Sequence, residues 1–403
     1  MIMPLENKRW IRLMTLKSYL WPGLFALASL GAAPMVLAHP DIDEFSETAF
    51  TQQPQTVDCT LENGTASTCY KITVNYLPED LEIGPFCPAT LTDAGGIWEW
   101  TGENAKLYRV DETFLRMLDD LGYRFFDEDG TVHVVDAATE RPTVDHACIN
   151  VSPDESVEIT MLLPVTPVMA DSPTPLGTVS KVGVALNGVP VFSDAPSIQQ
   201  TGHMPALDTC GGHIDPGGWY HWHATSTDIE TVFDASGVIA DCALEQDSGA
   251  LFGYAFDGFL MFGSTEADGK VAAGLDTCNG HIGPTSAGET YHYHATDDFP
   301  NLPACLVGVQ AADNFSTTAT AGIGATRAGA DGRNEPPRGG GGAPRQMPPD
   351  FSQAAEALGV APDDLMQALG DPRSGPPDLA AAAKTLGVTE EALRAALPPP
   401  LDR

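Results

Sequence analysis

Six of the ten histidines in this 403-residue chain fall in two short segments of similar sequence. In each segment a Gly-His pair is followed, several residues later, by a His-x-His pair. The six residues are His213, His221, His223, His281, His292 and His294. Alternate residues of a β-strand point to the same face, about 7 Å apart, so each His-x-His pair should place two imidazoles side by side. Three neutral imidazoles with one open position form a typical site for Zn²⁺ or Cu²⁺. We therefore predict that these histidines bind a divalent transition metal, zinc or copper.

The neighbours of the histidines leave an alternative open. The rings can instead hydrogen-bond to Asp208, Asp276 or backbone carbonyls and only brace the fold. The two aspartates can orient a ligating imidazole, or they can cap their own turns. Tyr220 and Tyr291, which begin the two histidine tetrads, are further candidate partners of the site. Duplication of the whole set favours metal ligation over simple bracing.

The histidines belong to an internal duplication of the chain. Each copy begins with a segment that reads as strand, Asn-Gly or Asp-Gly turn, and strand. The matching segments are 182–192 with 252–262, 207–214 with 275–282, and 220–225 with 291–296. The sequence does not decide between two separate three-histidine sites and one shared site. Separate sites would cluster His213, His221 and His223, whereas a shared site would bring His223 close to His294.

The order of these motifs resembles the YHYH-domain family, named after the tetrad that stands here as Tyr291-His292-Tyr293-His294. The shared pattern is Gly-x-Ala-x-Asn/Asp-Gly, then Asp-Thr-Cys-x-Gly-His, then Tyr-His-Trp/Tyr-His-Ala, over about 181–310. The resemblance implies an exported protein and implies no particular reaction. The first tetrad departs from the pattern with Trp222 in place of the inner tyrosine. Both histidines are kept, so the exchange leaves metal ligation possible but excludes a phenol at that position of the first copy.

The charge of the chain excludes some classes of partner. There are 20 Lys and Arg residues against 55 Asp and Glu residues, a formal net charge of −35. Nucleic acid and anionic membrane surfaces need basic patches, so we expect neither as a partner. A Gly-x-Ser-x-Gly elbow, a phosphate-binding loop and a His-Glu-x-x-His motif are all missing from the sequence.

The N-terminus has the pattern of an export signal. A positively charged start is followed by an apolar run from Tyr19 to Val36, and small residues precede a cleavage point after Ala38. We therefore predict a signal peptide at 1–38 and a secreted, periplasmic or cell-surface protein. In such a compartment eight cysteines favour disulfides. Proximity along the chain suggests Cys59–Cys69, Cys87–Cys148, Cys210–Cys242 and Cys278–Cys305.

We expect a mainly β protein, α+β overall, with an antiparallel duplicated domain that has long loops and disulfides. The predicted parts are an acidic mixed α/β region at 39–180, the duplicated domain at 181–310, a Gly/Pro-rich linker at 311–348 and a helical tail at 349–403. In the first region we expect a strand at 71–76, a helix at 113–121 and a hairpin at 124–135. The tail repeats itself at an offset of 28 residues and reads as two small helical hairpins. It is either a module that attaches to a protein or cell-surface partner, or a marginal helical tail with no specific partner.

Three functions are compatible with these features. The first is an exported metal-binding protein that uses the duplicated histidines. The second is a metal-dependent hydrolytic or redox enzyme, with the open metal position near Tyr220 or Tyr291. The third is a structural or adhesive surface protein without metal. We favour the first, because no separate general base with suitable spacing is evident.

Overall fold

The computed structural model describes residues 40–79, 81–239, 242–286, 288–325, 379–386, 388–389 and 392–394. The expected signal peptide, the later part of the expected linker and most of the helical tail lie outside these ranges. The chain divides into two units, Met1–Ala328 and Gly329–Arg403. In the described part of the second unit, α6 (Leu379–Leu386) is followed by a short helical turn, and Ala382, Ala383 and Leu393 are buried.

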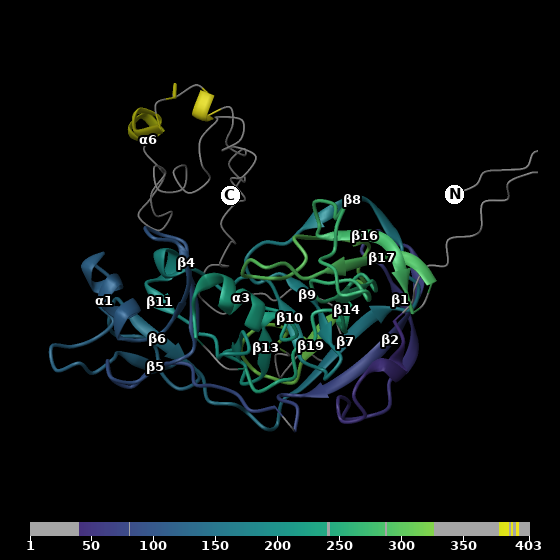
Figure 1. Cartoon of the computed structure of the whole chain (residues 1–403), viewed down its shortest axis with the longest axis horizontal. Helices are drawn as coiled ribbons and strands as arrows, with labels where there is room; N and C mark the ends of the chain where they lie inside the picture. Colours follow the sequence, from purple (N-terminus) through teal and green to yellow (C-terminus); the bar gives the residue numbers. More distant parts are fainter. Residues whose placement is uncertain are drawn as a thin grey trace, which may run out of the picture. The chain divides into compact units, whose positions relative to one another are not determined.

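An eight-stranded sheet forms the centre of the first unit (Figure 1). Its strand order is β12-β13-β10-β9-β14-β15-β17-β16. The first copy contributes β9 (Lys181–Ala185), β10 (Pro190–Phe192), β12 (Gly212–Ile214) and β13 (Tyr220–Trp222). The second copy contributes β14 (Leu251–Ala255), β15 (Leu260–Phe262), β16 (Gly280–Thr285) and β17 (Gly288–His294). The predicted strand, turn, strand unit is therefore confirmed in both copies, with Gly188 and Gly258 at positive φ in the two turns.

The two copies meet where β9 pairs with β14 in an antiparallel manner. Val184 lies opposite Tyr254, and Gly183 and Ala185 lie opposite Ala255 and Gly253. Val184 and Tyr254 are equivalent positions of the two copies, and the positions on either side of them pair crosswise, which is the register of a local two-fold axis perpendicular to the sheet. Corresponding strands follow outward on either side, and corresponding side chains of the two copies point to the same face of the sheet.

Apolar side chains cover both faces of this sheet. One core contains Tyr220 and Trp222 of β13 together with Tyr291 and Tyr293 of β17. The aromatic residues of both tetrads therefore face the interior on one side. The other core lies between this sheet and a four-stranded sheet of order β1-β2-β7-β19. The strands of that sheet are β1 (Gln55–Thr60), β2 (Ala66–Asn75), β7 (Glu158–Pro164) and β19 (Phe315–Thr317).

The start of the segment that composition assigns to a linker belongs instead to the folded unit. β19 pairs with β7, and the Phe315 ring contacts Phe192, Trp219 and Phe256. The single aromatic residue in this Ala/Gly-rich stretch thus anchors a strand that composition alone does not reveal. The described residues continue to Ala325, and 326–348 lies outside them.

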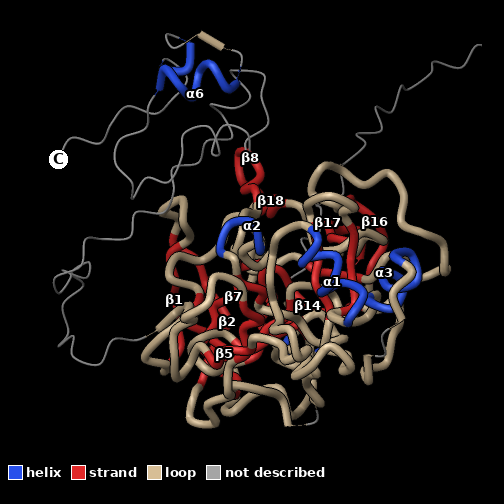
Figure 2. The backbone as a smooth tube through the Cα atoms, turned by 90° about the vertical axis from the view of Figure 1, so that its left-hand side faces the viewer, coloured by secondary structure: helices blue, strands red, loops and turns tan. Residues whose placement is uncertain are grey.

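The remaining elements form smaller groups around these sheets (Figures 1 and 2). The small sheets contain β3 (Ile97–Trp100), β4 (Lys106–Arg109), β5 (Val134–Asp136), β6 (Ala147–Asn150), β8 (Met169–Pro175), β11 (His203–Met204) and β18 (Cys305–Gly308). The helices of this unit are η1 (Ile42–Glu44), α1 (Glu112–Asp120), α2 (Ile198–Thr201) and α3 (Ile229–Ser236).

The expected helix at 113–121 is α1, and the expected strand at 71–76 lies in β2. The expected hairpin at 124–135 is reduced to one bridge between Phe126 and Val132, because β5 pairs in parallel with β6.

All four predicted disulfides are present, and the described residues contain no free cysteine. The predicted mainly β fold is confirmed, and most strand pairs are antiparallel. Within the eight-stranded sheet, β10 pairs with β13 and β15 pairs with β17 in parallel. In the described ranges, none of the helices has both the length and the hydropathy that a bilayer span requires.

Candidate metal centres

The three histidines of the first copy converge at one margin of the eight-stranded sheet. His213 of β12 lies opposite His221 of β13 in the antiparallel ladder, and His223 follows directly after β13. The His223 Nε2 atom is 3.1 Å from Nε2 of His221 and 3.2 Å from Nε2 of His213. His221 and His223 are each 2% exposed, and His213 is partly exposed. Neighbouring strands thus bring three imidazoles to one point.

Backbone carbonyls fix the orientation of two of these rings. Nδ1 of His213 is 3.1 Å from the Pro205 carbonyl, and Nδ1 of His223 contacts the Ser193 carbonyl. A carbonyl only accepts hydrogen bonds, so each Nδ1 must carry the proton. In a neutral ring the other nitrogen, Nε2, is then a bare lone pair. His213 and His223 therefore point two acceptors at each other across 3.2 Å, with no proton between them.

Burial also makes protonation of these rings unfavourable. Desolvation lowers the pKa of His223 to about 4 and the pKa values of His213 and His221 well below the ordinary value. A metal cation accounts for the convergence without charging the rings. Tetrahedral zinc with nitrogen ligands at about 2.0–2.1 Å separates those nitrogens by about 3.3 Å. The observed separations of 3.1 and 3.2 Å fit that requirement.

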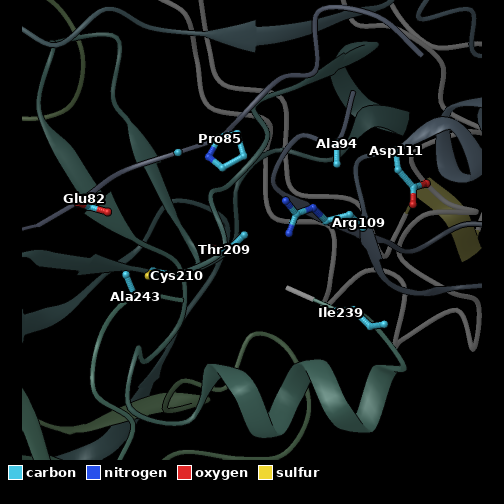
Figure 3. A pocket seen from close by; sticks show the side chains of 10 residues that line it. Glu82, Pro85, Ala94, Arg109, Asp111, Thr209, Cys210, Ile239 and Ala243 are labelled. Carbon is cyan, nitrogen blue, oxygen red and sulfur yellow. The ribbon is translucent and has the colours of Figure 1, made fainter. Parts of the chain in front are cut away.

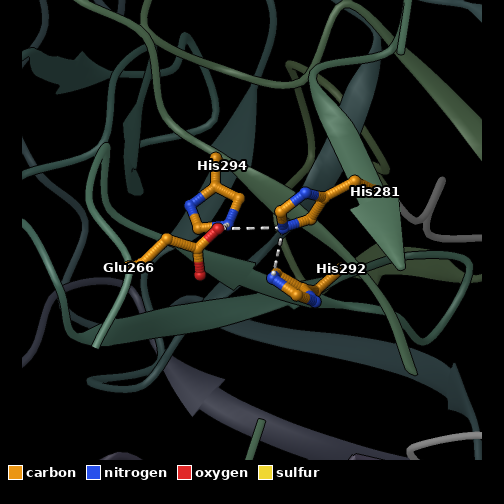
Figure 4. Close-up of side chains that lie close together, drawn as sticks. All are labelled: Glu266, His281, His292 and His294. Carbon is orange, nitrogen blue, oxygen red and sulfur yellow. Dashed lines mark hydrogen bonds and ion pairs between the residues drawn. The ribbon is translucent and has the colours of Figure 1, made fainter. Parts of the chain in front are cut away.

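The second copy builds the same arrangement at the opposite margin of the sheet (Figure 4). His281 of β16 lies opposite His292 of β17, and their Nε2 atoms are 3.2 Å apart. Each Nδ1 again faces a carbonyl, that of Ala273 for His281, Thr290 for His292 and Gly263 for His294, at 3.2, 3.1 and 2.7 Å. Desolvation lowers the pKa of His292 to about 4 and also lowers that of His294. The His292 and His294 rings are therefore also held neutral, with their Nε2 lone pairs directed inward.

Glu266 joins the second cluster only. Its Oε1 atom is 3.1 Å from Nε2 of His281 and 3.8 Å from Nε2 of His294. Sequence reasoning did not identify this residue, because it lies outside the duplicated motifs. Glu266 is four residues after the end of β15, and the residue four positions after the end of β10 in the first copy is Pro196. A search for differences between the copies near the histidines would have found it.

The structure brings the six histidines together as two separate clusters. In each cluster the potential ligand atoms lie within 4.8 Å of one another: His213, His221 and His223 in one, and Glu266, His281, His292 and His294 in the other. No shared site joins His223 to His294. Each of the two clusters could hold a metal ion.

Asp208 and Asp276 cap turns and do not orient the imidazoles. Oδ1 of Asp208 accepts hydrogen bonds from the backbone N–H groups of Cys210 and Gly212, and Oδ2 accepts one from the Tyr220 hydroxyl at 2.8 Å. In the second copy Asp276 accepts from the corresponding backbone groups and from the Tyr291 hydroxyl at 3.0 Å.

These hydrogen bonds engage the side chains of both aspartates and both tyrosines. Among the described residues, none of the four hydrogen-bonds to an imidazole nitrogen. Of the two roles open to the aspartates, orienting an imidazole or capping a turn, these hydrogen bonds support the second. The Asp–Tyr pairs instead hold the turns from which β12 and β16 begin. Burial raises the pKa of Asp208 to about 6, although its four hydrogen-bond donors act in the opposite direction.

Aromatic rings support the two clusters from the sheet. Phe192, at the end of β10, makes a T-shaped contact with His221, and Phe262, at the end of β15, makes the same kind of contact with His292. These contacts to equivalent residues fix the ring planes in both copies.

A pocket of about 530 Å³ elsewhere in the molecule is lined by Glu82, Arg109, Asp111 and Ile239 among others, and none of the six histidines borders it (Figure 3).

Comparison with known protein families gives a match over part of the chain. Residues 160–271 match the model of a family described as YHYH protein, which confirms the resemblance predicted from the motifs. The match contains the first histidine cluster and Glu266 and ends before His281, so the second cluster lies largely outside it. No curated protein and no solved structure matches the chain.

Proposed function

We propose that this chain is an exported protein that binds two transition-metal ions, zinc or copper, one in each histidine cluster, for storage, delivery or a surface role. The observation that carries the proposal is the facing pair of Nε2 lone pairs on His213 and His223. Two acceptors at this distance repel each other in a buried place unless a cation lies between them.

A role in bracing the fold explains the position of only one of the two nitrogens of an imidazole ring. Hydrogen bonds from Nδ1 to carbonyls fasten five of the six imidazoles to the backbone. A purely structural role gives no reason for the remaining nitrogens to converge, and certainly none for the same convergence to occur in two copies. Metal ligation explains both, since carbonyl partners at Nδ1 orient a ligating imidazole.

A metal-dependent enzyme remains a weaker second candidate. Tyr220 and Tyr291, the residues expected to assist a reaction, donate their hydroxyl groups to Asp208 and Asp276. Burial and these carboxylates raise the pKa values of both tyrosines well above the ordinary range. Neither phenol is therefore placed to exchange a proton with a metal-bound molecule.

Four disulfides are typical of an extracellular or periplasmic protein, and they support export. We propose that residues 1–38 direct this export and are removed after Ala38. The acidic composition argues against nucleic acid and anionic membrane surfaces as partners. We further propose that the tail after residue 348 attaches the protein to a protein or cell-surface partner.

Elemental analysis of the purified mature chain tests the metal proposal. A fragment that ends at residue 310 is unsuitable for this test, because it lacks β19 and leaves β7 without that neighbour. We expect two metal equivalents in the wild type and one in each of two variants, His221→Asn with His223→Asn, and His292→Asn with His294→Asn. His133→Asn with His146→Asn is the matched control, because both residues lie outside the clusters, and it should retain two equivalents. Equal, near-zero metal in all proteins, before and after incubation with Zn²⁺ or Cu²⁺, would refute the proposal and favour the bracing role.

A further inference from the structure

The two histidine clusters are held by the same carbonyl anchors but are bordered by different segments. In the first copy the anchors are Ser193 and Pro205, and in the second they are Gly263 and Ala273. The intervening chain is two residues longer in the first copy, where it forms α2. The same segment in the second copy contains a tight turn, in which the Glu266 N–H donates to the Lys270 carbonyl and the Gly269 N–H donates to the Glu266 carbonyl.

This difference decides whether a carboxylate reaches the cluster. The turn in the second copy aims Glu266 at His281, and its side chain is 26% exposed. In the first copy the equivalent position is Pro196, and the potential ligand atoms among the described residues are the three imidazoles alone. The nearby carboxylates Asp208 and Asp215 are already engaged by backbone N–H groups.

A divalent cation would therefore meet two different electrostatic environments. In the second cluster one carboxylate neutralises half of the cation's charge, and three nitrogens with one oxygen complete a tetrahedral set of four protein ligands. In the first cluster three neutral nitrogens leave the whole charge uncompensated in a buried place, which is costly. A small anion in the fourth position would remove part of that cost, and the partly exposed His213 marks the side from which it can enter.

We propose that the clusters are not equivalent: the Glu266 cluster is a closed site with four protein ligands, and the His213 cluster is an open site that takes a small anion as the fourth ligand of its metal. This inference rests on the proposed function, since both clusters must bind metal. It assigns any exchange of ligands or reaction at the metal to the first copy, and retention of the ion to the second.

Cobalt(II) and sodium azide test the inference in the full mature chain. His281→Asn combined with His292→Asn should leave only the first cluster loaded, and His213→Asn only the second, with one cobalt equivalent each. We expect azide to shift the visible absorption bands of cobalt in the His281→Asn/His292→Asn variant, with saturation, and to leave those of His213→Asn unchanged. Adding Glu266→Gln to His213→Asn should create an azide response. Glu289 is an exposed carboxylate on the hairpin of β16 and β17, which carries His281 and His292. Adding Glu289→Gln to His213→Asn is the matched control and should create no azide response.

The outcomes separate the two proposals. An azide response of both single-cluster variants, or of neither, with one cobalt bound in each, would overturn the non-equivalence and leave the proposed function intact. An azide response of His213→Asn that does not depend on Glu266 would overturn it as well. Absence of bound cobalt from the wild type and from both variants would overturn the proposed function itself.

Discussion

Val184 and Tyr254 lie directly opposite each other at the centre of the eight-stranded sheet, and they occupy the same position in the two copies of the duplicated sequence. The glycines beside them let the two strands approach. A Cβ atom at Gly183 would lie 2.2 Å from the Tyr254 carbonyl oxygen, and one at Gly253 would lie 2.3 Å from that of Val184. The junction between the copies therefore requires glycine at both positions.

Alanine at either junction glycine should lower the free energy of unfolding by about 2–4 kcal/mol, because backbone atoms cannot move aside as a flexible side chain can. Urea unfolding of Gly183→Ala and Gly253→Ala measures this loss. Gly177→Ala is the control, since the nearest atom to its added Cβ would be 3.9 Å away. Equal stabilities of all three variants would contradict the close approach at the junction.

The Asp–Tyr pairs should act on stability more than on metal content. Tyr220→Phe removes a hydrogen bond to Asp208 and also the acceptor of the Trp222 indole N–H, so we expect a loss of about 1–3 kcal/mol. Tyr291→Phe removes only the bond to Asp276 and should cost less. Both variants should still bind two metal equivalents. Loss of one equivalent in either variant would show that the tyrosine contributes to the metal site directly.

The metal-free protein should lose stability as the pH falls. The pKa of His223 is about 4 when folded against an ordinary value of 6.5, so between these values the unfolded chain binds a proton that the folded chain does not. This single ring should lower the free energy of unfolding by about 2 kcal/mol from pH 7 to pH 5. Urea unfolding in the presence of a chelator gives the slope.

Two buried carboxylates act in the opposite sense over part of that range. Burial raises the pKa values of Asp208 and Asp215 to about 6, so the folded chain binds their protons first. The contribution of His223 is isolated by comparison with His223→Asn, which should lose less stability between pH 7 and pH 5 than the wild type does. Parallel pH profiles of the two proteins would show that His223 is not held neutral by burial.

Metal should stabilise the folded state in two separable steps. A free zinc concentration one hundred times the dissociation constant adds about 2.7 kcal/mol for each site that binds only the folded chain. Thermal unfolding should therefore shift upward on zinc addition and return on chelation. The shift should be smaller in His281→Asn and in His213→Asn than in the wild type. A full-size shift in a variant that lacks both clusters would place the binding elsewhere on the acidic surface.

Local sequence patterns predicted most of what positions the histidines. The Asn-Gly and Asp-Gly turns defined the paired strands, and the spacing of His221 and His223 placed both rings on one face. Proximity along the chain was enough for all four cysteine pairs, because each disulfide joins two cysteines that are consecutive in the sequence.

The features that the sequence did not reveal depend on long-range packing. Phe315 lies in a stretch whose composition indicates a linker, and it is ordered by aromatic rings from three distant segments. Glu266 reaches the second cluster through a turn that has no counterpart in the first copy. The choice between one shared site and two separate sites depended on the pairing of β9 with β14, which puts the two copies side by side with their histidines at opposite margins.

The most direct test of the account is a crystal structure of the metal-loaded protein with diffraction data collected on both sides of the absorption edge of the bound metal. The account predicts two anomalous peaks, each about 2.0–2.1 Å from three histidine Nε2 atoms, one at His213, His221 and His223 and the other at His281, His292 and His294. Nε2 atoms hydrogen-bonded to water, with no anomalous peak within bonding distance of either cluster, would contradict it.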